Sequence, residues 1–80
     1  MQKLRERGVY ALLDESEVVA VANIRGAYLL YDPQDWELYP RVQAIYEVYA
    51  SGSIHYRGKQ TYWRIEDLSD TGRTAPHGKS

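Results

Sequence analysis

The stretch 53–68, SIHYRGKQTYWRIEDL, most constrains the fold because it is typical of a β-hairpin. We take Gly58-Lys59 as a two-residue turn, since a type II′ turn has positive φ at its first position and favours glycine there. Pairing through this turn separates the side chains into two faces. One face carries Ile54, Tyr56, Thr61, Trp63 and Ile65, and the other carries His55, Arg57, Gln60, Tyr62 and Arg64. The pattern predicts a core-facing side and a cationic, aromatic outer side.

Three apolar runs precede this hairpin, at 9–13, 17–24 and 27–31, with short polar breaks between them. The second run is rich in β-branched residues, which favours strands over a helix. Runs of this length with short breaks predict a β-meander. After them, Asp32-Pro33 and the acidic residues that follow are typical of a helix start, so we expect a short helical turn near 33–39.

Residues 41–50, RVQAIYEVYA, fit two structures. As a strand that turns at Ser51-Gly52, the segment pairs Tyr49 with Ile54 but places Glu47 on the apolar face, which a bulge would repair. As a helix, it begins at Pro40 and carries an apolar stripe. We favour the strand.

These elements predict a mostly β fold, a small antiparallel sheet or barrel of five or six strands that is SH3-like or OB-like. The alternative is an α+β fold with a helix at 41–50. Residues 1–70 are expected to form a single small β-domain. Residues 71–80, TGRTAPHGKS, have few apolar anchors and are expected to be a disordered C-terminal tail.

Composition argues against most kinds of chemistry. The chain has no cysteine and two histidines, His55 and His77, so we expect no metal and no cofactor. No serine lies in a nucleophile motif and no glycine-rich phosphate loop is present, so the protein is not expected to be an enzyme. No apolar run approaches the roughly 20 residues that cross a bilayer. We therefore expect no membrane association and a cytoplasmic location.

The aromatic residues point to a binding surface instead. There are eight Tyr, two Trp and no Phe, so every ring carries a polar group, as is favoured where one side of a residue is wet. The candidate binding residues are His55, Arg57, Lys59, Tyr62 and Arg64 on the hairpin, with Trp36 as a further exposed aromatic residue. We expect a noncatalytic interaction module or accessory protein that binds another protein.

Two other functions stay open at this point. Cations beside aromatic rings also suit single-stranded nucleic acid, although the net charge of −1 argues against strong nonspecific binding. An enzyme of undetermined type is the third alternative. The sequence does not indicate an oligomeric state.

Overall fold

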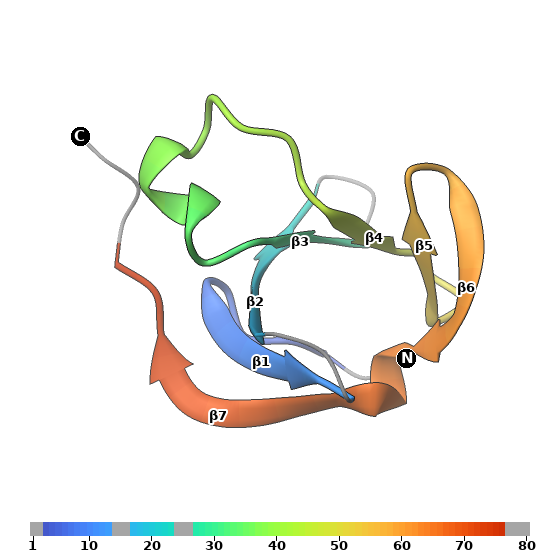
Figure 1. The fold of residues 1–80 in the computed structure, drawn as a ribbon. Helices are drawn as coiled ribbons and strands as arrows, with labels where there is room; N and C mark the ends of the chain where they lie inside the picture. Colours follow the sequence, from blue (N-terminus) through green and yellow to red (C-terminus); the bar gives the residue numbers. More distant parts are fainter. Residues whose placement is uncertain (1–2, 14–16, 24–26, 77–80) are drawn as a thin grey trace.

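The computed structural model describes residues 3–13, 17–23 and 27–76. Within these ranges seven antiparallel strands form one sheet in the order β6-β5-β4-β3-β2-β1-β7, which curls into a half-barrel (Figure 1). The strands are β1 (Gly8–Leu12), β2 (Glu17–Ala22), β3 (Tyr28–Tyr31), β4 (Tyr46–Val48), β5 (Ser53–Tyr56), β6 (Lys59–Arg64) and β7 (Leu68–Thr74). Two 3-10 turns in the described part are η1 (Asp35–Leu38) and η2 (Ile65–Asp67). The mostly β prediction is confirmed, with seven strands rather than five or six.

The strand between the meander and the hairpin is shorter than predicted and pairs one residue differently. β4 covers only Tyr46–Val48, and no helix forms at 41–50. Val48 lies opposite Ile54 and Glu47 lies opposite His55. The reason is a three-residue loop ending at Gly52, whose φ of 92° favours glycine. This register puts Glu47 on the outer face, so no bulge is needed in β4.

The hairpin turn also lies one residue earlier than predicted. Arg57 and Gly58 occupy it with φ values of 52° and 82°, as in a type I′ turn. Tyr56 therefore pairs with Lys59, and His55 pairs with Gln60. The pairing differs from the predicted one by two residues, and side chains alternate with a period of two. The residues of β5 and β6 consequently keep the sides that the sequence assigned to them, whereas Arg57 lies in the turn and Ile65 lies in η2.

The sheet has an apolar cluster on each face. The inner cluster fills the half-barrel, and its buried members are Leu4, Tyr10, Leu12, Val18, Ala20, Tyr28, Leu30, Val48, Ile54, Ile65 and Leu68. The outer cluster is Val9, Val19, Val21, Tyr31, Trp36 and Ala75. Residues 32–45, including η1, cover the outer face of the first strands, as the green segment of Figure 1 shows. The predicted helical turn near 33–39 is confirmed.

Trp36 lies within the outer cluster rather than on the surface. Its ring stacks on Tyr39 with centroids 4.5 Å apart and meets Tyr31 edge-on at 5.7 Å. Its indole Nε1 donates a hydrogen bond to the carbonyl of Pro76 (2.6 Å). The prediction of an exposed Trp36 is therefore wrong, because Tyr39, just after η1, and Tyr31 of β3 pack against it despite its acidic neighbours in sequence.

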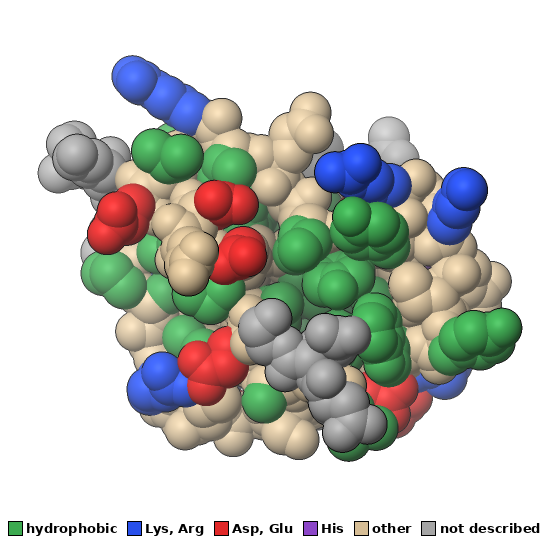
Figure 2. Space-filling model, viewed as in Figure 1, with side chains coloured by type: hydrophobic (Ala, Val, Ile, Leu, Met, Phe, Trp, Pro, Cys, Tyr) green, Lys and Arg blue, Asp and Glu red, His purple; other side chains and the backbone are tan. Residues whose placement is uncertain are grey.

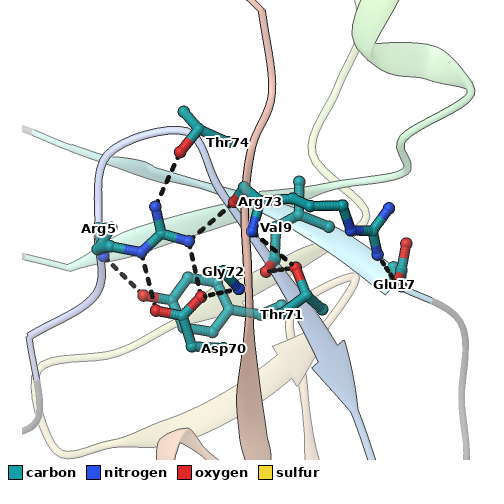
Figure 3. A network of polar contacts seen from close by, with 9 residues as sticks. Arg5, Val9, Glu17, Asp70, Thr71, Gly72, Arg73 and Thr74 are labelled. Carbon is teal, nitrogen blue, oxygen red and sulfur yellow. Dashed lines mark hydrogen bonds and ion pairs between the residues drawn. The ribbon is translucent and has the colours of Figure 1, made fainter.

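The two edge strands carry the same kind of bulge. In β6 the hydroxyl of Thr61 donates to the carbonyl of Ile54 (2.7 Å) and accepts from the backbone N–H of Trp63 (3.2 Å). In β7 the hydroxyl of Thr71 donates to the carbonyl of Val9 (2.7 Å) and accepts from the N–H of Arg73 (3.2 Å) (Figure 3). In both strands the register shifts at this place.

The residue after each threonine is the apex of its bulge. The apex is Tyr62 in β6 and Gly72 in β7, where φ is 82°. In each edge strand a threonine hydroxyl thus donates the hydrogen bond to the neighbouring strand that a backbone N–H donates in a regular ladder. The side chain at the apex takes no part in these hydrogen bonds.

Strand β7 includes residues that the sequence assigned to a tail. It pairs with β1 as far as Thr74, opposite Gly8. Ala75 follows, buried in the outer cluster, and its N–H donates to the carbonyl of Arg7 (2.8 Å). The predicted disorder is therefore wrong for 71–76, and the rest of the predicted tail, 77–80, lies outside the described residues.

An arginine near the start of the chain holds β7 in place. Arg5 donates to both carboxylate oxygens of Asp70 (2.8 and 2.6 Å), to the hydroxyl of Thr74 and to the carbonyl of Arg73 (both 2.8 Å) (Figure 3). Arg73 in turn pairs with Glu17 of β2. The bonds from Arg5 lower the pKa of Asp70 to about 2. Side-chain contacts therefore fix a strand that has few apolar residues.

This pKa predicts a particular loss of stability in acid. Because the pKa of Asp70 is lower in the folded protein than the ordinary 3.8, its contribution to stability is present above about pH 4 and is lost as the pH falls toward 2. We expect Asp70→Asn to remove part of the fall in Tm between pH 4 and pH 2, as measured by circular dichroism. Glu37→Gln, at an exposed position of η1, is the control and should keep the wild-type slope. Parallel curves for Asp70→Asn and wild type would contradict the assignment.

Candidate interaction surface

The outer face of β4, β5 and β6 continues the sheet beyond the part that residues 32–45 cover. We call it the hairpin face, and it consists of Glu47, His55, Gln60, Tyr62 and Arg64. Three of the predicted binding residues lie on it: His55, Tyr62 and Arg64. The hairpin face is therefore a sheet surface with one acidic, one basic and two aromatic members.

Tyr62 is fully exposed at the apex of the β6 bulge. Its side chain forms no hydrogen bond or ring contact with any residue that the structure describes. Tyr10, Tyr28 and Tyr31, by contrast, are buried in the two clusters, and the exposed Tyr49 and Tyr56 each contact another ring. The free ring of Tyr62 can therefore contact a second molecule without any change in the fold.

His55 is held by its neighbours on the same face. Its ring stacks on Tyr49 with centroids 3.8 Å apart and planes inclined by 22°. Its Nε2 hydrogen-bonds with the hydroxyl of Ser53 (2.9 Å), which in turn contacts the hydroxyl of Ser51 (3.0 Å). The other ring nitrogen, Nδ1, is buried and has no partner among the described residues. These contacts fix the orientation of the ring.

Arg64 is also fixed in place. Its Nη2 donates to the carbonyl of Ser51 (2.8 Å), and its Nε lies 3.2 Å from Oε2 of Glu66. Its backbone N–H donates to the carboxylate of Asp67 (2.9 Å). The guanidinium thus connects β6 to the loop between β4 and β5, while its side chain stays half exposed. An arginine held in this way loses little conformational entropy on binding.

The other two predicted cations of the hairpin lie apart from this face. Arg57 occupies the turn, and its guanidinium carbon lies 5.4 Å from the ring centre of Tyr56. Lys59 pairs with Tyr56 across the strands and so shares its face, opposite to the hairpin face. On that opposite side Tyr46 contacts both Tyr56 and Trp63. Figure 2 shows a hydrophobic area with Lys and Arg side chains beside it, on the side of the molecule where β5 and β6 lie in Figure 1.

The structure brings together some of the predicted binding residues and separates others. His55, Tyr62 and Arg64 share one face, Arg57 is at the turn, Lys59 is on the opposite face and Trp36 is buried. Sequence reasoning missed Glu47 as a member of the hairpin face and Tyr49 as the exposed ring that stacks on His55. The alternation of residues 46–49 would have found them if the three-residue loop had been used in place of a two-residue turn.

Neither a metal site nor a membrane-spanning helix is found in the described ranges. No group of three or more His, Asp and Glu side chains in these ranges is arranged to hold a metal ion. The helical segments described are too short to cross a bilayer. Comparison with known proteins gives no match to any family model, curated protein or solved structure. The surface itself is therefore the basis for assigning a function.

Proposed function

We propose that the protein is a noncatalytic interaction module that binds another protein through the hairpin face, with Tyr62 at the centre of the contact. The observation that supports this proposal is the difference between the two bulges. Both bulges are bridged by a threonine hydroxyl, but the apex of the β7 bulge is Gly72 with a φ of 82°, whereas the apex of the β6 bulge is Tyr62, whose φ is not positive. The bulge itself does not need an aromatic apex, so the exposed ring suggests a role outside the fold. The absence of cysteine fits a cytoplasmic location, which is part of the proposal.

The residues around Tyr62 suit a protein partner. Tyrosine and arginine are among the residues most enriched in binding hot spots, and Arg64 lies two residues from Tyr62 on the same face. Both Arg64 and His55 are already fixed by hydrogen bonds or stacking, which reduces the entropy lost when a partner binds.

Single-stranded nucleic acid is the second candidate, because Arg57, Lys59 and Tyr62 all lie on one hairpin. An SH3-like or OB-like barrel, the finer fold that we proposed from the sequence, is compatible with a curled antiparallel sheet, and OB-folds bind oligonucleotides on a strand face. However, Lys59 lies on the face opposite to Tyr62, and negative charge is present on the hairpin face at Glu47 and beside it at Glu66. These placements favour a protein partner.

The test compares Tyr62→Ala with a matched exposed position. A display library of protein fragments from the organism's own genome is selected against the immobilised protein, and the affinity of each recovered fragment is measured by calorimetry. We expect Tyr62→Ala to weaken binding by about 1–2 kcal/mol, roughly 5- to 30-fold, as at an interface hot spot. Leu38→Ala is the control, because Leu38 is 59% exposed on η1, away from the hairpin. It should leave binding unchanged.

Two results would overturn the proposal. One is a set of fragments that bind Tyr62→Ala and the wild-type protein equally well. The other is saturable binding of short single-stranded RNA or DNA whose affinity falls steeply with salt and depends on Tyr62, which would select the nucleic-acid function.

A further inference from the structure

The hairpin carries an exposed ring beside positive charge on the side opposite to the hairpin face. Tyr56 is 40% exposed and pairs with Lys59, and the guanidinium carbon of Arg57 lies 5.4 Å from its ring centre. The partly buried Trp63 lies on the same side, since Tyr46 contacts both rings. We call Tyr56, Arg57 and Lys59 the basic patch. Its two cations form no ion pair with any residue in the described ranges.

The 3-10 turn η1 carries the opposite arrangement, an exposed aliphatic side chain beside negative charge. Side chains three residues apart lie on the same side of a 3-10 helix. Trp36 and Tyr39 have this spacing and stack on each other. Asp35 and Leu38 have it too and share another side, where Leu38 is 59% exposed and Asp35 is exposed. We call Asp35, Leu38 and the exposed Glu37 between them the acidic patch.

The two patches have opposite net charge. Residues 28–40 contain three acidic and no basic residues, whereas residues 53–64 contain three basic and no acidic residues, Arg64 of the hairpin face among them. Within the described part of the chain neither carboxylate of the acidic patch forms an ion pair. Arg41 adjoins η1, where its N–H donates to the carbonyl of Leu38 (2.7 Å), but the three acidic residues outweigh its single charge.

Both patches are accessible from one side of the molecule. In Figure 2, Asp and Glu side chains and hydrophobic side chains lie over η1, and Lys and Arg side chains lie beside hydrophobic ones over the β5–β6 hairpin. This face therefore presents apolar side chains at two places, with negative charge beside them at one place and positive charge at the other. A surface with this distribution is complementary to itself.

We propose that this face binds a second copy of the chain, so that the acidic patch of each copy lies against the basic patch of the other. A two-fold axis that lies in the interface, midway between the patches, brings both pairs into contact at once, whatever the distance between the patches. Exposed ion pairs are worth little by themselves, so burial of Leu38 and Tyr56 supplies most of the affinity and the charges set the orientation. This inference concerns another surface than the hairpin face and does not depend on the proposed function.

Sedimentation equilibrium of the full chain, from about 10 µM to 1 mM, tests for this dimer, because a small interface gives weak association. We expect the average mass to rise from 9.3 kDa toward twice that value as the concentration increases. The dissociation constant should increase at least about threefold between 0.1 M and 1 M salt, because the Debye length then falls from about 10 Å to about 3 Å.

Charge reversal followed by mixing tests the pairing of the patches. Arg57→Glu with Lys59→Glu gives a chain with two acidic patches, and Asp35→Lys with Glu37→Lys gives a chain with two basic ones. Each double variant alone should associate at least about tenfold more weakly than wild type, because like charges then meet in both contacts. An equimolar mixture should associate about as strongly as wild type, because opposite charges meet again in both contacts of the mixed dimer. A variant that failed to fold would not recover in this way.

Three single variants locate the contact. Leu38→Ala removes exposed apolar surface from both contacts of the dimer and should weaken association at least about threefold. Gln60→Glu adds negative charge next to Lys59 in sequence but on the hairpin face, so it is the matched control and should associate as wild type does. Tyr62→Ala should also associate as wild type does.

The other outcomes overturn the inference. They are a mass that stays at 9.3 kDa up to about 1 mM, and a mixture of the two reversed variants that associates no more strongly than its components. A dimer lost with Tyr62→Ala but kept with Leu38→Ala would place association on the hairpin face. A monomeric chain that binds single-stranded DNA, and loses it with Arg57→Glu and Lys59→Glu, would assign the basic patch to nucleic acid instead. Protein fragments whose binding does not depend on Tyr62 would reject the proposed function but not this dimer.

Discussion

Ile54→Ala is expected to lower the free energy of unfolding by about 2–5 kcal/mol, as large-to-small changes in a core do. Ile54 is completely buried in β5 and belongs to the inner cluster together with Val48 and Ile65. A domain of this size has a total stability of only about 5–15 kcal/mol, so the loss is a large fraction of it. Urea denaturation followed by tryptophan fluorescence measures the change.

The matched control for this change is Tyr62→Ala on the neighbouring strand. It removes a larger side chain from a fully exposed position, so the free energy of unfolding should stay within about 0.5 kcal/mol of wild type. Equal losses for the two variants would show that Tyr62 packs against the protein and that the assignment of hairpin faces is wrong.

Truncation after Asp70 is expected to destabilise the protein by at least about 3 kcal/mol. It removes the end of β7 from β1, together with the buried Ala75 and the carbonyl of Pro76 that accepts from Trp36. A hydrogen bond is worth about 1 kcal/mol net, and a buried donor left without an acceptor costs about 1–3 kcal/mol. The Tm of the truncated and full-length chains, measured by differential scanning calorimetry, gives the comparison.

Truncation after Pro76 is the control for this experiment, because it keeps every contact described for β7 and Trp36. Its Tm should match that of the full chain. If truncation after Asp70 also left the Tm unchanged, the end of β7 would contribute nothing to stability. The prediction of a disordered tail at 71–80 would then be correct.

The faces of the final hairpin could be predicted from sequence even though its turn could not. Gly58 alone suggested a turn with glycine first, whereas Arg57 also adopts a positive φ in the structure. Nothing local marks an arginine for that conformation. The resulting error in pairing was two residues, and because strands alternate with a period of two, Ile54 and Tyr62 kept their predicted sides. An error of one residue, as in β4, exchanged the sides and misplaced Glu47.

The end of β7 and the position of Trp36 could not be predicted for a different reason. Thr71, Arg73 and Thr74 give no apolar alternation, because polar contacts hold this part of the strand. Its main partner, Arg5, is 65 residues away from Asp70 in the chain. Trp36 has acidic neighbours in sequence, but it is buried in contact with Tyr31, Tyr39 and Pro76. Contacts between distant segments decide both cases.

The bulges of β6 and β7 interrupt both edge strands of the open sheet. A regular edge strand offers evenly spaced backbone groups onto which the strand of another molecule can add, and this is a common route to aggregation. Here the half-barrel ends in β6 on one side and β7 on the other, and each strand is interrupted near its middle by a threonine-bridged bulge. Neither end presents the regular spacing that a growing fibril needs. The protein can thus keep an open sheet, with its two edges apart, without relying on barrel closure to protect them.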